Sequence, residues 1–236
     1  MADRPYTVLS CAMSLDGYLD DTSGTRLVLS NAADLDRVDE LRAGCDAILV
    51  GAATVRADDP RLLVRAPDRR ARRVAQGRAP SPQKVTVTRH PHLDPASAFF
   101  TAGEAATLVY CASPAVARTR ERLGRAATVV DAGASPTMGA VSEDLAAKGV
   151  RRLLVEGGQS VHTQFLSEGL ADELHVVVAP FFVGDSRAHR VVGDARFPWN
   201  RDRRAHLTEV RQIDDVVLLR YALSPRFEHD EPGGRP

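Results

Sequence analysis

The chain of 236 residues has few cysteines and no excess of charge of either sign. Cys11, Cys45 and Cys111 are widely spaced in apolar surroundings, so they form neither a disulfide framework nor a metal-binding spacing. They indicate buried, reduced thiols in the cytoplasm. The 31 Lys and Arg residues balance 31 Asp and Glu residues, so no broad positive field favours nucleic acid. An anionic ligand would therefore need a local pocket.

Long hydrophobic runs and several common motifs are also missing. No run of about 18 apolar residues occurs, so we expect no membrane span, and the N-terminus lacks the pattern of a signal peptide. The seven histidines form no zinc-binding pair, and we therefore expect no metal. G-x-S-x-G and Walker A are absent, and no G-x-G-x-x-G follows the first predicted strand, which argues against a P-loop ATPase and the usual dinucleotide fingerprint.

Short runs of Val, Ile and Leu alternate with helical patterns. Strands are predicted at 6–13, 47–51, 84–88, 106–111, 127–132 and 152–158, and helices at 31–44, 114–123, 138–148 and 158–168. This alternation predicts an α/β fold with a mostly parallel central sheet flanked by helices. Three further strands, without helices between them, predict an antiparallel C-terminal hairpin; they are 172–184, 206–213 and 215–223.

Two polar segments are predicted to lack regular secondary structure. We expect a single domain over residues 1–223 and a disordered tail at 224–236, which is polar and rich in Pro and Gly. Residues 66–82 are rich in Arg and hold three prolines. We interpret them as a solvated basic excursion, with phosphate contact as the alternative.

The stretch EGGQS, residues 156–160, closes a predicted strand and opens a helix. Gly157 and Gly158 lack side chains, so backbone N–H groups can approach a ligand there. The helix N-terminus behind them favours an anion such as a nucleotide phosphate. A purely structural Gly-Gly turn is the alternative.

The stretch GAATVRAD, residues 51–58, leaves another apolar strand. Thr54 and Asp58 are one helical turn apart and can face the same cleft. A carboxylate there could orient a substrate or handle a proton. Asp59 precedes Pro60 and is typical of a turn or capping carboxylate.

Four stretches together resemble a known family. MSLDGYL, DELRAGCDAILVGAATVRADDPRLLVR, LLVEGG and FLSEGLADELHVVVAPFFVG, in unbroken order over roughly residues 5–223, resemble the reductase domain of bacterial riboflavin biosynthesis. This family shares the dihydrofolate reductase fold. The resemblance implies a homodimer that uses NADPH to reduce the ribosyl group of an aminopyrimidine ribosyl 5′-phosphate to ribityl. The substrate would be 5-amino-6-(5-phosphoribosylamino)uracil or its 2,5-diamino precursor.

The resemblance also implies roles for individual residues. Asp58 and Glu156 are the candidate catalytic carboxylates. Cofactor contacts are expected from Gly51, Thr54, Asp58, Gly157, Gly158, Gln159 and Ser160, and substrate contacts from Ser30, Arg42, Leu62, Arg65 and Glu156. The arginines suit the 5′-phosphate. Arg89, which follows a predicted strand, is our candidate for pairing with the 2′-phosphate of NADPH.

Some features depart from the family pattern. Ser10 stands where bacterial members commonly carry lysine, and Val28, in RLVLS (26–30), stands at a common tryptophan position. The zinc deaminase that bacteria often fuse to this reductase is not found, which predicts a stand-alone reductase. A same-family reductase of another small substrate, such as a pterin or a specialised metabolite, is therefore an alternative. So is a catalytically silent nucleotide-binding protein.

Overall fold

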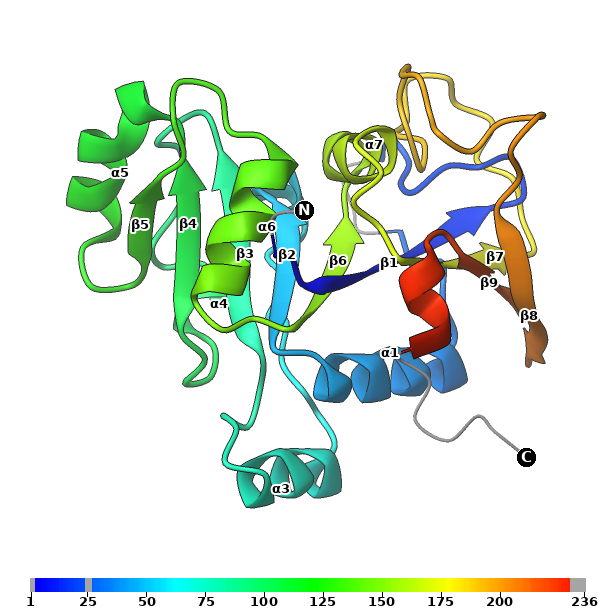
Figure 1. Cartoon of the computed structure of the whole chain (residues 1–236), viewed down its shortest axis with the longest axis horizontal. Helices are drawn as coiled ribbons and strands as arrows, with labels where there is room; N and C mark the ends of the chain where they lie inside the picture. Colours follow the sequence, from blue (N-terminus) through cyan, green and yellow to red (C-terminus); the bar gives the residue numbers. More distant parts are fainter. Residues whose placement is uncertain (1–2, 24–26, 230–236) are drawn as a thin grey trace.

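The computed structural model describes residues 3–23 and 27–229. These residues contain one sheet of nine strands, in the order β5-β4-β3-β2-β6-β1-β7-β9-β8 (Figure 1). Its strands are β1 (Tyr6–Ser14), β2 (Ala47–Gly51), β3 (Gln83–Thr88), β4 (Thr107–Cys111), β5 (Thr128–Asp131), β6 (Arg152–Gly157), β7 (Glu173–Ala179), β8 (His206–Ile213) and β9 (Val216–Ala222).

The direction of the strands confirms the predicted architecture. Strands β1 to β7 pair in parallel, whereas β9 pairs antiparallel with both β7 and β8. The helices are α1 (Ala32–Gly44), α2 (Ala52–Asp58), α3 (Pro67–Ala75), α4 (Ala98–Thr101), α5 (Val116–Leu123), α6 (Met138–Ala147) and α7 (Gln159–Ser167). Two short 3-10 helices are η1 (Ser113–Ala115) and η2 (Pro225–His229). Within the described residues, no helix has the length and hydropathy needed to cross a membrane.

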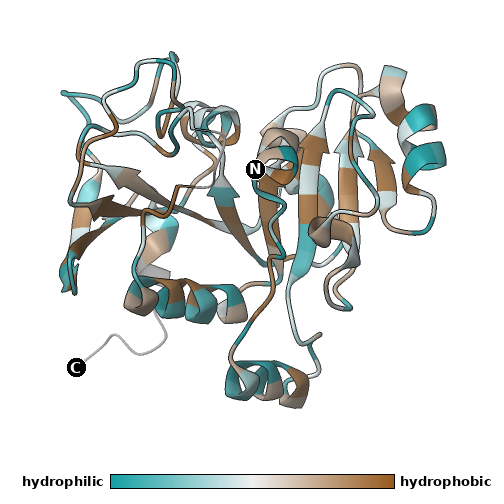
Figure 2. Ribbon diagram, turned by 180° about the vertical axis from the view of Figure 1, so that it is seen from behind, coloured by the Kyte–Doolittle hydropathy of each residue, from teal (hydrophilic) through white to brown (hydrophobic). Residues whose placement is uncertain are grey.

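The central strands are buried on both faces. All five residues of β2 and of β4 are buried, and Figure 2 shows these strands as hydrophobic. Ile48 and Val50 belong to one apolar cluster, while Leu49 belongs to the other. Because successive side chains of a strand point to opposite faces, β2 has core on either side. This burial explains why its sequence is apolar throughout instead of alternating.

The helix α1 differs from a helix with a simple apolar face. Leu35, Val38 and Leu41 are only partly buried, whereas Asp34 and Asp39 are 1% and 2% exposed. Each buried carboxylate accepts hydrogen bonds from neighbouring groups. Apolar spacing does not reveal such burial, because an Asp within a helix normally faces water.

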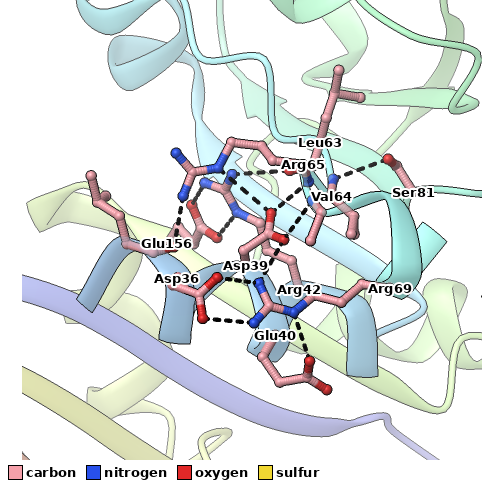
Figure 3. A network of polar contacts seen from close by, with 12 residues as sticks. Asp36, Asp39, Glu40, Arg42, Leu63, Val64, Arg65, Arg69, Ser81 and Glu156 are labelled. Atoms are coloured by element: carbon pink, nitrogen blue, oxygen red, sulfur yellow. Dashed lines mark hydrogen bonds and ion pairs between the residues drawn. The ribbon is translucent and has the colours of Figure 1, made fainter. Parts of the chain in front are cut away.

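The basic segment 66–82 is not the loop that we expected. Residues Pro67–Ala75 form α3, with Pro67 in the first turn, where its missing N–H costs nothing. The helix lies beside α1, which supplies the carboxylates that its arginines need (Figures 1 and 3). Arg69 contacts Asp36 at 2.7 Å and Asp39 at 3.0 Å. Its charge is therefore neutralised within the fold, which argues against phosphate contact by Arg69.

Arg73 on α3 serves a different purpose. It is 2% exposed and donates to the carbonyl oxygens of Ala43 at 2.9 Å and Cys45 at 2.6 Å. Carbonyls at the C-terminus of a helix lack partners within the helix and carry partial negative charge. A buried guanidinium at this point thus secures the end of α1, and it explains why the Arg-rich segment folds.

The tail also differs from the expected disorder where it is described. Pro225–His229 form η2, and Ser224 Oγ donates to Asp172 Oδ1 at 2.6 Å. Arg226 donates to Pro5 O and to Asp172 Oδ2, both at 3.3 Å. These polar contacts hold the segment against the start of β1, although its composition resembles that of a disordered chain. Residues 230–236 lie outside the described part.

Candidate functional site

The two motifs from distant parts of the sequence meet at one edge of the sheet. Strands β2 and β6 are parallel neighbours, so their carboxyl ends lie together. A Cβ atom added to Gly158 would lie 3.1 Å from Thr54 Oγ1, and one added to Gly51 would lie 3.1 Å from Val161 Cγ2. Glycine at these positions therefore permits α2 and α7 to approach each other closely.

The turn at Gly157 and Gly158 precedes the N-terminus of α7. Gly157 has φ +115°, a conformation that side chains disfavour, and its peptide bond to Gly158 is cis. Gly158 is the N-cap residue and supplies no side-chain cap. The first N–H groups of α7, from Gln159 and Ser160, are thus free of intrahelical partners and suited to an anion. The residues present fit the diphosphate of a dinucleotide.

The imidazole of His162 lies directly under this turn. A Cβ atom at Gly157 would come within 3.3 Å of His162 Cε1, and His162 is only 1% exposed. Burial lowers the pKa of His162 from its ordinary value of 6.5 to about 4. The ring is therefore neutral at physiological pH and serves as packing beneath the glycine turn.

This pKa predicts a loss of stability in mild acid. Between about pH 6.5 and pH 4 the unfolded chain binds a proton at His162 that the folded chain does not. Stability should therefore fall as the pH is lowered through this range, by at most about 3 kcal/mol. His162→Gln should flatten this part of the denaturant-derived stability curve, whereas the exposed His92→Gln should not. Parallel curves for wild type and His162→Gln would contradict the assignment.

Arg42 and Glu156 form a bidentate ion pair beside the turn (Figure 3). Arg42 Nε donates to Glu156 Oε1 at 2.7 Å, and Arg42 Nη2 donates to Glu156 Oε2 at 2.6 Å. Their side chains are 18% and 13% exposed. Arg42 Nη1 also donates to Leu63 O at 3.3 Å, so it joins α1, β6 and the loop after α2. The sequence proposed both residues for the substrate site without indicating that they contact each other.

The loop after α2 carries two residues in the left-handed region. Asp59 has φ 41° and Leu62 has φ 49°, which is uncommon outside glycine. Asp59 is the C-cap residue of α2, and its Oδ1 accepts a hydrogen bond from Phe99 N at 3.1 Å, in agreement with the predicted turn or capping role. Leu62 is 2% exposed. Such strained backbone persists only where its surroundings hold it, and it concentrates at functional sites.

Arg65 lies at the far end of this loop. Its side chain is 58% exposed, and its Nη2 donates to Leu35 O at 2.7 Å. Asp39 accepts from the Arg65 backbone N–H at 2.6 Å, which fixes the loop on α1. An open surface pocket of about 400 Å³ is lined by Ala32, Leu35, Asp36, Asp39, Arg65 and Ala66.

The other candidate residues lie around these groups. Asp58 is the exposed last residue of α2, and the exposed Arg89 directly follows β3, the neighbour of β2. Ser30 precedes α1 and donates to Asp34 Oδ2 at 2.7 Å. Ser30 and Arg42 therefore belong to opposite ends of α1. No group of His, Cys, Asp or Glu in the described residues has metal-binding geometry.

A buried polar network was missed by sequence reasoning. It joins α1 to β7 and β9 through Asp34, Arg37, His175, Glu173 and Arg220. Its members come from three separate segments, and no linear spacing relates them. The only sequence signal is charged and imidazole groups inside otherwise apolar strands, such as the His in ELHVVVA.

The glycine turn and the helix N-terminus lie at the carboxyl ends of parallel strands, which is where open α/β sheets commonly bind their ligands. The RibD C-terminal domain family model matches residues 5–219, and the chain belongs to this family.

Curated relatives and solved structures agree with this membership. The chain is 39% identical over 182 residues to a 2,5-diamino-6-ribosylamino-4(3H)-pyrimidinone 5′-phosphate reductase of Archaeoglobus fulgidus, covering 77% of this chain and 83% of that protein. A protein of the same name from Methanothermobacter thermautotrophicus is 36% identical, covering 80% and 84%. The structure of Acinetobacter baumannii RibD matches with a TM-score of 0.75 and 26% identity, over 93% of this chain and 58% of that one.

Proposed function

We propose that this protein is an NADPH-dependent reductase that converts the ribosyl group of an aminopyrimidine ribosyl 5′-phosphate to ribityl in riboflavin biosynthesis. The observation that carries the proposal is the close approach of Gly158 to Thr54, next to the Arg42–Glu156 pair. A Cβ atom on Gly158 would lie 3.1 Å from Thr54 Oγ1. Family membership and the names of relatives at 36% and 39% identity support the substrate class.

The residues of this chain would divide the work of binding and orientation. Backbone N–H groups at the start of α7 would hold the diphosphate, and Thr54 and Asp58 would contact the nicotinamide end. NADPH, when bound, supplies a hydride, which the ring-opened sugar accepts at C1′ as an imine. Asp58 is our choice for the carboxylate nearest the reacting carbon, where it would orient the sugar, with water as an alternative proton source.

The substrate would lie between α1, the loop after α2 and the end of β6. Arg65 has the more exposed guanidinium and can present it to a 5′-phosphate. Arg42, already paired with Glu156, would align that carboxylate with the sugar and its amine. The side chain of Leu62 is buried, so its backbone, which is held at φ 49°, would make the contact with the substrate. Ser30 would contact the pyrimidine ring.

The reductase assay tests the proposal directly. NADPH consumption, followed by absorbance, should depend on the pyrimidine ribosyl phosphate, and the product should carry a ribityl chain by mass spectrometry. Turnover with another small substrate alone would favour the alternative reductase suggested by Ser10 and Val28. Binding of NADPH without turnover of any of these substrates would favour a silent nucleotide-binding protein.

The glycine turn gives a prediction for cofactor affinity. Gly158→Ala would place a methyl group 3.1 Å from Thr54 Oγ1 and obstruct the diphosphate loop. We expect the dissociation constant for NADPH to rise at least tenfold, about 1.4 kcal/mol. Gly44→Ala is the control, because nothing lies within 4 Å of its Cβ position. Gly157 is less suitable, since its φ of +115° makes any side chain a threat to folding. Unchanged NADPH affinity in Gly158→Ala would contradict the role.

Arg89 gives a prediction for the choice between NADPH and NADH. Its exposed guanidinium follows β3, at the same sheet edge as Gly51. If it pairs with the 2′-phosphate, Arg89→Ala should weaken NADPH about tenfold or more and leave NADH nearly unchanged. Arg118→Ala on α5 controls for the loss of a surface charge. An equal loss for both cofactors would remove Arg89 from this role.

We also propose a cytoplasmic homodimer, as the family resemblance implies. The three cysteines are free thiols, which suits a reducing compartment. Leu207 and Val210 on the edge strand β8, and Val217 on β9, are exposed. Exposed apolar side chains are unusual at a sheet edge that has no partner. These residues are candidates for the contact, and light scattering of the purified chain would measure its mass in solution.

A further inference from the structure

Lys84 is a buried cation that the proposed division of work does not use. It lies on β3 and is 0% exposed. Its Nζ donates to Phe99 O at 2.8 Å and to Ala102 O at 2.7 Å, and it lies 5.8 Å from the centre of the Phe99 ring. Burying an ammonium group is costly, and lysine is seldom buried completely unless its charge has partners. What this cation adds over an apolar side chain is two directed hydrogen bonds to α4 and the residue that follows it.

The short helix α4 is held at both ends by other segments. A helix of this length is not stable by itself. Its N-cap residue Ser97 makes no side-chain cap; instead Asp59 Oδ1, from the end of α2, accepts from Phe99 N. At the other end Lys84 binds the carbonyl of Ala102. A carboxylate at the N-terminus and a cation at the C-terminus satisfy the free backbone groups and suit the helix dipole. The helix thereby joins β3 to the start of the loop after α2.

The same segment supports the loop after α2 at further points. Phe99 and Leu62 belong to one buried apolar cluster and are 0% and 2% exposed. A Cβ atom on Gly103 would lie 2.7 Å from Leu63 Cδ2, so glycine at this position leaves room for the Leu63 side chain. The left-handed backbone of Asp59 and Leu62 lies along this contact. Such backbone persists only where its surroundings hold it, and here residues 97–103 supply that support.

We propose that α4, anchored by Lys84, is a brace that positions the substrate-binding loop. The brace fixes the loop after α2 in the conformation that presents the Leu62 backbone to the pyrimidine ribosyl phosphate. This inference rests on the proposed function, and Lys84 acts as a positioning residue that contacts neither substrate nor cofactor. NADPH would be held by other segments, namely the glycine turn and α7. Loosening the brace should therefore weaken the substrate and leave NADPH unaffected.

Steady-state kinetics of Lys84→Met test the proposal. Methionine is similar in length but has no donor to hold the two carbonyls. The KM for the pyrimidine ribosyl phosphate should rise about fivefold or more, the usual effect of losing one positioned contact. At saturating substrate, kcat should stay within about threefold of wild type, because the brace acts on binding. The dissociation constant for NADPH should stay within about twofold.

Tyr110→Phe is the matched control for a loss of stability. Tyr110 lies on the neighbouring strand β4, is 1% exposed and packs in the other apolar cluster. Its hydroxyl donates to Asp144 Oδ2 at 2.6 Å, so this variant also loses a buried hydrogen bond. Its melting temperature should fall, but its KM for the substrate should remain that of wild type. A merely structural role for Lys84 would give the same pattern in Lys84→Met.

A second pair of variants tests the brace without removing a buried charge. Gly103 and Gly77 are both exposed and both have φ +72°, which asparagine tolerates better than most residues. Nothing lies within 4 Å of the Gly77 Cβ position, so only a side chain at Gly103 meets Leu63. Gly103→Asn should raise the KM for the substrate about threefold or more, whereas Gly77→Asn should not. This pair decides the proposal if Lys84→Met does not fold.

Two results would overturn the brace. One is an unchanged substrate KM in both Lys84→Met and Gly103→Asn, and the other is an equal weakening of NADPH and substrate. If wild type binds the pyrimidine ribosyl phosphate without reducing it, the reductase proposal fails. The dissociation constant of that compound, measured by calorimetry, then replaces KM and still decides the brace. If wild type does not bind the compound, both proposals fail.

Discussion

Glu156→Gln is expected to lower kcat/KM about a hundredfold, which corresponds to about 2.7 kcal/mol of transition-state stabilisation. Glu156 ends β6 directly before the glycine turn and receives two hydrogen bonds from Arg42, at 2.7 and 2.6 Å. The neutral amide keeps the shape but loses the charge, and it can accept only one of these bonds. A group held this firmly is well suited to orient a reacting sugar, because little is lost in ordering it.

A double-variant cycle separates two roles for Arg42. If Arg42 acts by aligning Glu156, both single variants remove the same interaction. The double variant Arg42→Gln/Glu156→Gln should then have a kcat/KM no lower than that of the less active single variant. If Arg42 instead binds the 5′-phosphate independently, the two losses should multiply. The thermal midpoint of each variant is measured alongside, since an unpaired charge in a partly buried pair also destabilises the fold. Full activity in Glu156→Gln would contradict a role for this carboxylate.

The sequence was sufficient to predict most strands and a mostly parallel sheet with an antiparallel end, but not the order of the strands in the sheet. Runs such as AILVG are apolar because both faces of β2 are buried, and apolar runs bounded by helices predict parallel strands. The hairpin of β8 and β9 followed from the lack of a helix between them. The sequence indicated that Thr54 and Gly158 both follow apolar strands, but that these strands, β2 and β6, are neighbours in the sheet was found only in the structure.

Interactions between charged groups were not predictable from the sequence. Arg69 and Arg73 were predicted to face solvent. Arg69 instead pairs with carboxylates of α1, and Arg73 donates to carbonyl oxygens at the C-terminus of α1. The burial of Asp34 beside Arg37 has no counterpart in periodicity. Such contacts depend on how far apart two segments lie after folding, and spacing along one segment does not contain that distance.

Asp58→Asn is expected to lower kcat by about 10²- to 10⁴-fold, which is the usual effect of removing a positioned acid or base. Asp58 lies at the exposed end of α2, one helical turn after Thr54. Thr54 is the residue of α2 that lies next to Gly158 of the glycine turn. The loss should appear in turnover of the folded protein, so the melting temperature is measured alongside to account for any change in stability. The measurement is steady-state turnover at saturating NADPH and substrate, with a thermal melt of the same sample.

Asp59 provides the matched comparison, because it has the same side chain at the next position. Its Oδ1 accepts from Phe99 N at 3.1 Å, and Lys84, which is 0% exposed, donates to the carbonyl of the same Phe99 at 2.8 Å. The carboxylate thus links the end of α2 to α4. Asp59→Ala removes this acceptor and a side chain that tolerates φ 41°, so stability should fall by about 1–2 kcal/mol. Turnover of the folded fraction should stay within a few-fold of wild type. If Asp58→Asn instead keeps full turnover while Asp59→Ala abolishes it, the catalytic carboxylate has been assigned to the wrong residue.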